Sequence, residues 1–122
     1  MDGRMDESTA ACLFCKIVEK EIPAEIVRES DTALAFRDIN PQAPTHVLVV
    51  PKEHHPNAAE LAAASPALLA DVVALAAEVA AEEGIDEAGY RIVFNTGAQA
   101  GQTVFHVHAH LLGGRALQWP PG

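Results

Sequence analysis

The sequence predicts an α+β fold built from one antiparallel sheet, one long helix and one short helix. The prediction rests on the order of the segments, which run as a short helix, two strands, a third strand, a long helix and two final strands. Apolar residues recur at helical spacing along residues 66–83, whereas five shorter segments alternate apolar and polar positions or are rich in β-branched residues. The 122 residues suffice for one domain with a single hydrophobic core.

The long helix has a recognisable start and end. Ser65 is a good N-cap, and Pro66 fits the first helical turn. Gly84 suits the left-handed position that follows a helix. The apolar positions between them form a stripe at helical spacing, made of Leu68, Val72, Leu75 and Val79. The short helix is predicted over residues 13–19.

Five strands are predicted, at residues 24–29, 32–37, 46–50, 90–95 and 104–112. Ser30-Asp31 is turn-like, so the first two strands should form a hairpin. Strands joined by short turns pair antiparallel, so we expect a five-stranded antiparallel meander with the long helix over one face. The segments 38–44 and 96–102 are expected to be loops.

Composition narrows the function classes. The net charge of −9 argues against a broad nucleic-acid-binding surface, which needs basic residues. No segment reaches the ~18 apolar residues of a membrane span, and the first residues contain no apolar signal segment. We therefore expect a cytoplasmic protein that binds no membrane, with a flexible tail at residues 1–11 and a single domain at 12–122. The acidic residues of segment 78–87 are expected to form a solvated face.

Three histidines alternate with apolar residues in the last predicted strand. Alternation along a strand puts Phe105, Val107, Ala109 and Leu111 toward the core and His106, His108 and His110 together on the other face, ~6.7 Å apart. Such a row fits either a catalytic metal or the handling of a phosphate. The Gly-punctuated segment 97–103 directly before it favours a phosphate, because its backbone N–H groups can face an anion. Thr103 and Asn95 would add a hydroxyl and an amide donor.

The two cysteines of the chain form a Cys-x-x-Cys pair, Cys12 and Cys15. In a cytosolic protein this spacing indicates a metal site or redox chemistry rather than a disulfide, and two reduced buried cysteines without a metal are the plain alternative. A closed tetrahedral zinc site would need two more ligands.

Several motifs together resemble the histidine triad (HIT) superfamily, and in particular its branch of histidine triad nucleotide-binding proteins. They are His106-Val-His108-Ala-His110, Ile22-Pro-Ala24, Phe36-Arg-Asp38-Ile39-Asn-Pro-Gln-Ala-Pro-Thr-His46, Gly101-Gln-Thr-Val-Phe-His106, Gly113-Gly-Arg115 and Trp119-Pro-Pro-Gly122. The resemblance covers residues 12–122. It implies a HIT-like fold and a homodimer whose sheets join into ten strands, with the tail around Trp119 a candidate to approach the partner's active site.

The resemblance also implies a chemistry, the hydrolysis of purine nucleoside phosphoramidates through a covalent nucleotidyl-histidine. By position, His108 would be the nucleophile, and a neutral imidazole suits that role. His110 would contact a phosphate oxygen and assist the leaving group. His46 would support the tautomer of His108 or relay protons. Two alternatives stay open, a dinucleoside polyphosphate hydrolase and a nucleotide-binding interaction module with vestigial catalysis.

The expected ligand is a purine nucleotide similar to adenosine or guanosine monophosphate. Asp38 would accept hydrogen bonds from the ribose hydroxyls. The phosphate or leaving group would be held by Asn95, Gly101, Gln102 and Thr103, where Thr103 replaces the serine of many relatives. The base would enter an apolar slot made of Phe14, Ile17, Ile22, Phe36 and Ile39.

The resemblance to bacterial HIT proteins with the cysteine pair implies a structural zinc bound by Cys12, Cys15, His54 and His106, with His55 as the adjacent alternative to His54. A zinc with four protein ligands has no open position for substrate. Removing a structural zinc should lower stability, with activity following the folded fraction. Removing a catalytic metal should instead stop turnover at once while the fold survives.

Overall fold

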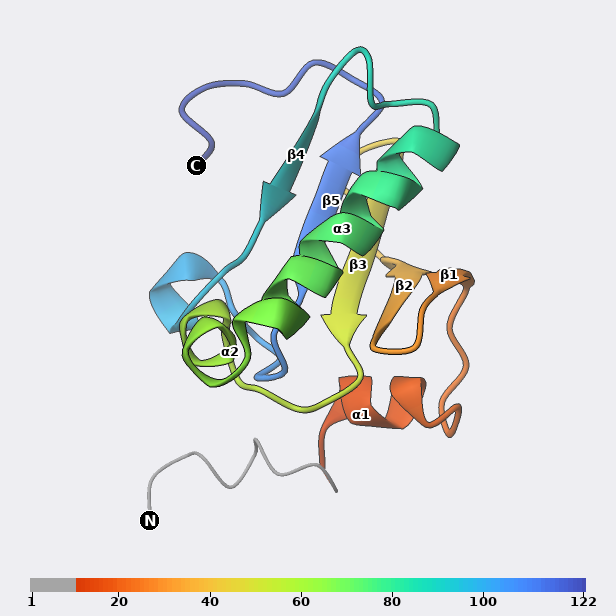
Figure 1. Ribbon diagram of the computed structural model, residues 1–122. Coiled ribbons are helices and arrows are strands. Elements are labelled where there is room, and N and C mark those ends of the chain that lie inside the picture. Colours follow the sequence, from red (N-terminus) through yellow and green to blue (C-terminus); the bar gives the residue numbers. More distant parts are fainter. Residues whose placement is uncertain (1–10) are drawn as a thin grey trace.

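The computed structural model describes residues 11–122, and most of the predicted N-terminal tail lies outside the described residues. One five-stranded antiparallel sheet has the order β1-β2-β3-β5-β4 (Figure 1). The strands are β1 (Ile26–Glu29), β2 (Ala33–Arg37), β3 (Thr45–Pro51), β4 (Tyr90–Val93) and β5 (Ala109–Gly113). The helices are α1 (Leu13–Val18), α2 (Ala58–Ala64) and α3 (Pro66–Glu82), and a 3-10 turn, η2, spans Ala98–Ala100. The α+β class and the antiparallel sheet are thus confirmed.

The sheet is not the simple meander that was expected. The chain crosses from β3 through α2 and α3 and enters the sheet again at the edge, as β4. β5 then fills the position between β3 and β4 and pairs antiparallel with both. Within this crossover, α3 lies across one face of the sheet (Figure 1).

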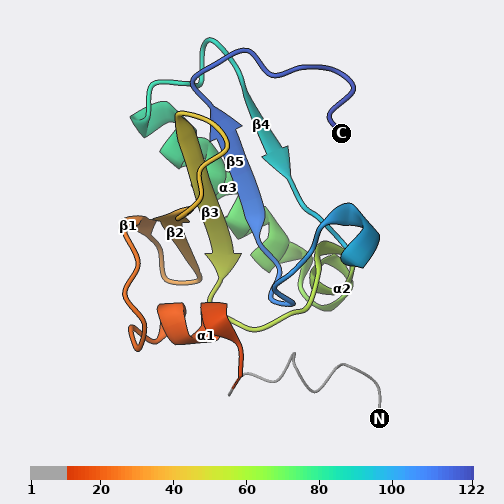
Figure 2. The same cartoon turned by 180° about the vertical axis from the view of Figure 1, so that it is seen from behind.

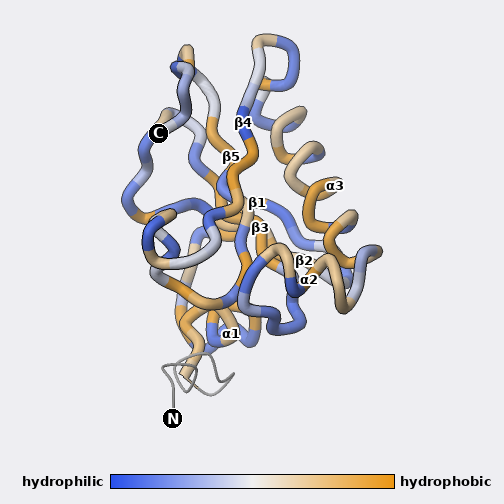
Figure 3. The backbone as a smooth tube through the Cα atoms, turned by 90° about the vertical axis from the view of Figure 1, so that its left-hand side faces the viewer, coloured by the Kyte–Doolittle hydropathy of each residue, from blue (hydrophilic) through white to orange (hydrophobic). Residues whose placement is uncertain are grey.

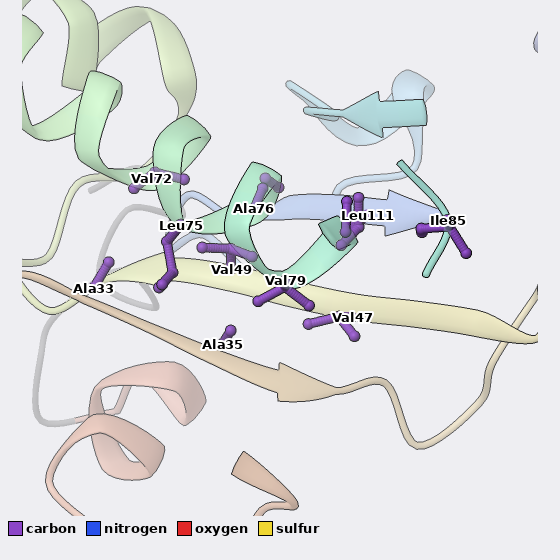
Figure 4. Close-up of a cluster of buried hydrophobic side chains, with 12 residues drawn as sticks. Ala33, Ala35, Val47, Val49, Val72, Leu75, Ala76, Val79, Ile85 and Leu111 are labelled. Carbon is purple, nitrogen blue, oxygen red and sulfur yellow. The ribbon is translucent and has the colours of Figure 1, made fainter. Parts of the chain in front are cut away.

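The main core lies between α3 and the sheet. Val72, Leu75, Ala76 and Val79 of α3 face Ala33, Ala35, Val47, Val49 and Leu111 from the strands (Figure 4). The helix begins as predicted, because the Ser65 side chain accepts a hydrogen bond from the N–H of Leu68. Gly84 follows it with φ of +73°, a conformation that favours glycine. In side view, α3 follows one face of the sheet and α1 lies near one end (Figure 3).

The acidic residues on α3 do more than face solvent. Arg28 of β1 bonds Glu78 and Glu82, and Arg37 of β2 makes a two-pronged contact with Glu83, with both N–O distances 2.9 Å. These ion pairs tie the helix to the edge hairpin, so the prediction of a merely solvated face was incomplete.

The opposite face of the sheet carries α1 at one end (Figure 2). Phe14 and Ile17 of α1 pack there with Leu34, Phe36, Leu48 and Val50 in a second buried cluster. No helix in residues 11–122 is long and apolar enough to cross a membrane.

Helix α2 was missed from the sequence because it has a single buried apolar residue, Leu61, and therefore no periodicity. A signal for it does exist. The Asn57 side chain caps the helix by accepting a hydrogen bond from the N–H of Glu60. Leu61 packs with Leu68 and Val107 in a third cluster.

The last strand was predicted too long, since β5 begins only at Ala109. Before it, the N–H of Val107 bonds the carbonyl of His55 instead of a neighbouring strand. His106, Val107 and His108 are all buried, because both sides of this segment are covered. The side chains still alternate as predicted, because Val107 packs with Leu61 and Leu68 under the helices, whereas the ring of Phe14 from α1 lies beside both His106 and His108, and His108 lies beside His110.

Candidate active site and metal centre

A cavity of about 370 Å³ opens between α1, the end of β2 and the segment before β5. Its size is in the range of small-ligand pockets. Its walls are largely apolar and come from Leu13, Phe14, Ile17, Ile22, Pro23, Ala24, Phe36, Ile39, Leu48 and Val104. Its polar members are Arg37, Asp38, Thr103, His108 and His110. An apolar slot with a few convergent polar groups at one place is typical of a site for a flat ligand that carries a polar end.

The five residues predicted to form the base slot all line this cavity. Phe14 links the slot to the histidines, because its ring lies edge-on to Phe36 at 5.5 Å between centroids and to His108 at 5.0 Å. Leu13, Leu48 and Val104 also line the cavity but were not predicted. Nothing in their sequence context distinguishes them from core residues.

His108 is nearly buried, and its Nδ1 lies 2.8 Å from the carbonyl oxygen of His106. A carbonyl only accepts, so Nδ1 carries the proton and donates it. The lone pair of His108 is therefore on Nε2. Burial lowers the pKa of His108, so the ring is neutral at pH 7. This is the state that a nucleophilic imidazole needs.

His46 and His110 form a hydrogen-bonded pair whose direction is fixed by the backbone. The N–H of Gln42 donates to Nδ1 of His46 over 3.0 Å, so the proton of neutral His46 sits on Nε2. That atom lies 2.9 Å from Nδ1 of His110, which therefore accepts and keeps its own proton on Nε2. Burial lowers the pKa of His46, and burial with the neighbouring His108 and His46 lowers the pKa of His110 to about 4. His110 is thus a neutral N–H donor.

Asp38 stands at the edge of the same cavity. One of its oxygens, Oδ1, accepts the N–H of Asn40 over 2.7 Å, and Oδ2 lies 3.5 Å from Nε2 of His46. Among the described lining residues, Arg37 is the one Lys or Arg side chain, and it is paired with Glu83 and Glu25. The cavity therefore presents neutral imidazole and hydroxyl donors to an anion rather than an unpaired cation.

The Gly-punctuated loop uses most of its donors internally. The side chain of Gln102 accepts the N–H of Gly97 and donates to the carbonyls of Pro56 and Val104. The backbone N–H of Gln102 bonds Gly97, and that of Gly101 bonds Ala98. Of the residues predicted to hold the phosphate, only Thr103 lines the cavity. A phosphate contact from Asn95, Gly101 or Gln102 stays a prediction.

The residues implied to bind zinc converge on one point. Cys12, Cys15, His54 and His106 bring one donor atom each within 4.8 Å of the others. The Sγ–Nδ1 distances are 3.4 Å for Cys12–His106, 3.5 Å for Cys15–His106 and 3.4 Å for Cys15–His54, and the two Nδ1 atoms lie 3.2 Å apart. Typical zinc–ligand bond lengths in a tetrahedron predict edges of about 3.5 Å for sulfur–nitrogen and about 3.3 Å for nitrogen–nitrogen. The donor set therefore fits a zinc ion.

Further contacts support this fit. Nε2 of fully buried His106 donates to the carbonyl of Pro51 over 2.8 Å, which leaves the lone pair of Nδ1 toward the sulfurs. Burial beside Cys12 raises the pKa of the Cys15 thiol to about 12, so a bound cation would take the place of its proton. His55 is instead paired with Glu53, 2.7 Å away, and its ring is not one of the four groups that converge.

Asp38, His46 and His110 also lie close enough together to suggest a metal site. The hydrogen bond from Gln42 argues against it, because it puts a proton on the His46 nitrogen that would have to bind the ion. The carbonyls of Pro51 and His106 and the N–H of Gln42 were all missed from the sequence. Backbone atoms are present at every position and give no sequence signal.

Comparisons with known proteins agree with the motifs. Residues 19–117 match the family model described as HIT domain. The chain is 47% identical over 105 residues to the purine nucleoside phosphoramidase of Escherichia coli, a match that covers 86% of this chain and 88% of that protein. It is 46% identical to the 14 kDa zinc-binding protein of Zea mays, over 98% of this chain and 92% of that protein.

Solved structures point the same way. The crystal structure of a HIT family hydrolase from Legionella pneumophila superposes with a TM-score of 0.88 at 51% identity, covering 91% of this chain and 99% of that one. The resemblance inferred from the motifs is thereby confirmed: the chain belongs to the histidine triad family of HIT domain proteins.

Proposed function

We propose that this protein is a hydrolase that cleaves purine nucleoside phosphoramidates, with His108 as the nucleophile. The observation that carries the proposal is the hydrogen bond from Nδ1 of His108 to the His106 carbonyl, which leaves a lone pair on Nε2 of a ring that lines the cavity. The names of the phosphoramidase and hydrolase relatives support the same reaction class.

In the proposed first step, Nε2 of His108 forms a bond to phosphorus and the bond from phosphorus to the amine nitrogen breaks. The nitrogen leaves with the bonding pair and takes up one proton from solvent. In the second step, water attacks phosphorus, the bond to His108 breaks, and one proton returns to solvent. The sum is one water consumed, with one nucleoside monophosphate and one amine released.

Each group around the nucleophile has a proposed task. His110, held as an Nε2–H donor by His46, stabilises negative charge on the phosphoryl oxygen and on the leaving nitrogen. Thr103 lines the same cavity and would add a hydroxyl donor. Asp38 keeps acceptor capacity for the ribose hydroxyls, since one of its oxygens bonds only a backbone N–H there. The apolar slot would take the base.

We further propose a structural zinc at Cys12, Cys15, His54 and His106, which is supported by the donor distances and by the zinc-binding relative. When bound, the ion would supply a crosslink from α1 to the segments before α2 and before β5. The thiolates it needs favour a reducing compartment such as the cytoplasm.

A homodimer is also proposed, with β4 as the edge that joins the two sheets. β4 is an outer strand of the sheet, and Arg91 in it donates to the carbonyl of Gln118 over 2.9 Å. This contact holds the tail with its largely exposed Trp119 near the same edge. Sedimentation analysis of the wild type against a β4 variant, Ile92→Asp, measures the association.

The decisive experiment uses a fluorogenic adenosine phosphoramidate. The wild type should hydrolyse it with a burst of nucleotidyl-enzyme, and His108→Ala should abolish hydrolysis while keeping affinity for adenosine monophosphate. His55→Ala is the matched control, because His55 lies outside the cavity. A wild type without hydrolysis or burst would end the proposal. A preference for dinucleoside polyphosphates, or binding without turnover, would support one of the two alternatives instead.

A further inference from the structure

The chain just after β5 lies against the loop that follows β2. Gly114 has φ of +91°, and a Cβ atom added to it would lie 2.8 Å from Cβ of Pro44. Next to it, Arg115 donates from Nη2 to the carbonyl of Gln42 and from Nη1 to the carbonyl of Ala116, both over 2.9 Å. Gly114, packed against Pro44, and Arg115, bonded to Gln42, thus hold the 38–44 loop in place.

Both backbone groups of Gln42, its N–H and its carbonyl, form hydrogen bonds to side chains. Its carbonyl accepts from Arg115, and its N–H donates to Nδ1 of His46. That N–H is what sets the proton of His46 on Nε2 and, through His46, the proton of His110 on Nε2. The tautomers of two cavity histidines therefore depend on the position of one peptide group that Arg115 holds.

The other hydrogen bonds of the loop do not replace this contact. Asn40 is held through its N–H by Asp38, and the side-chain amide of Gln42 donates to the carbonyl of Asn40. Both bonds keep the loop folded on itself, but neither reaches the Gln42 carbonyl. The planar fork of arginine directs Nη1 and Nη2 to two different carbonyls, whereas the three N–H donors of a lysine at position 115 would share one nitrogen.

We propose that Arg115 is a positioning residue for the His46–His110 pair, acting through the backbone of Gln42. Its loss frees Gln42 to move, His46 then populates the tautomer with its proton on Nδ1, and His110 loses its fixed Nε2–H donor. The catalytic part of this inference rests on the proposed phosphoramidase function. The tautomer part stands independently of it.

The test is long-range proton–nitrogen correlation NMR of protein labelled with ¹⁵N-histidine, at neutral pH and with measured zinc content. In the wild type, His46 and His110 should both show a protonated Nε2. Arg115→Gln should move both toward a mixture of tautomers, and Gly114→Ala should shift the same two signals by displacing Pro44. Arg115→Lys should fall between the wild type and Arg115→Gln, and it keeps the test available if Arg115→Gln folds poorly.

Arg91→Gln is the matched control. Arg91 also donates to a backbone carbonyl near the C-terminus, that of Gln118, but it does not bond the 38–44 loop. This variant should leave the signals of His46 and His110 unchanged. In kinetics, Arg115→Gln should lower kcat about threefold to tenfold with KM within about twofold, as expected for one hydrogen bond acting through another residue.

The outcomes distinguish failure of the positioning role of Arg115 from failure of the proposed phosphoramidase function. Wild-type tautomers in a folded, zinc-loaded Arg115→Gln or Arg115→Lys protein would overturn the positioning role, whatever happens to kcat. Shifted tautomers in a protein whose wild type hydrolyses no phosphoramidate would support the role of Arg115 on the histidine pair and contradict the proposed function.

Discussion

The proposed metal centre and the proposed catalytic cluster draw on the same five-residue stretch of sequence, yet they use histidine in opposite ways. His106 donates from Nε2 to Pro51 and turns the lone pair of Nδ1 toward two sulfurs. His108 donates from Nδ1 and keeps its lone pair on Nε2, and His110 accepts on Nδ1 and keeps a proton on Nε2. Under the proposed function, one ring would thus serve as a metal ligand, one as a nucleophile and one as a hydrogen-bond donor.

This difference shows that a histidine motif does not by itself define the role of each of its histidines. The tautomer of each ring is set by the hydrogen-bond partner of one nitrogen, which decides whether the second nitrogen carries a lone pair or a proton. For His106 and His108 that partner is a backbone carbonyl. The two regions are also joined, since His106 offers its side chain to the metal centre and its carbonyl to His108. The first prediction below tests whether their tasks separate.

The largest expected effect comes from paired substitutions. His108→Gln should lower turnover by roughly 10⁴-fold or more while zinc content and folding are unchanged, because only the nucleophile is lost. His106→Gln should release zinc and lower the free energy of unfolding by about 3 kcal/mol, since it removes a fully buried ligand. Single-turnover kinetics and metal analysis measure both. Equal loss of zinc in the two variants would refute the division of tasks.

Chelation should separate a structural from a catalytic metal. Loss of a metal crosslink worth several kcal/mol should lower the melting temperature by roughly 10–20 °C. Turnover measured below the melting temperature of the chelated protein should follow the fraction of folded protein. Calorimetry and activity assays on the same samples, at increasing chelator concentration, measure the melting temperature and the turnover together. Prompt loss of turnover with an unchanged melting curve would support the catalytic-metal alternative.

Acid should weaken the catalytic cluster through His110. Its pKa is about 4 in the folded protein, against ~6.5 when unfolded, so the unfolded state binds more protons between these values. The contribution of neutral His110 is therefore complete above pH 6.5 and is lost as the pH falls toward 4, by roughly 2–3 kcal/mol. Urea unfolding at pH 7 and pH 4.5 should show a smaller decrease for His110→Asn than for the wild type. Equal decreases would disprove this account.

The smallest effect is expected in the loop before the histidines. Gln102→Ala should cost about 1–3 kcal/mol, because it leaves Gly97 and two carbonyls without the amide that bonds them. Exposed Gln99 in the same loop is the control, and Gln99→Ala should change stability by less than about 0.5 kcal/mol. Urea denaturation measures the free energy of unfolding of both variants. Reduced nucleotide affinity at unchanged stability in Gln102→Ala would restore its predicted role as a phosphate ligand.

Much of this architecture could be predicted from the sequence. The α+β class, the long helix and its Ser65 cap follow from local rules, and the motif of His106, His108 and His110 points to the family. The prediction was wrong where the strand was extended through residues 104–108, because the N–H of Val107 bonds His55 instead of a neighbouring strand, although the side chains alternate as expected. The tautomers could not be predicted, since backbone groups of Gln42, Pro51 and His106 decide them and leave no trace in residue identity.

The paired guanidinium of Arg37 has a consequence for the turnover cycle. Because Glu83 and Glu25 already balance its charge, no unpaired cation of the described lining residues retains a phosphate in the cavity. A phosphoramidate carries one negative charge at phosphorus, whereas the monophosphate product approaches two near neutral pH. A protein with net charge −9 repels the second more than the first. In the proposed reaction, hydrolysis would thus increase the repulsion on the bound nucleotide and favour release of the product.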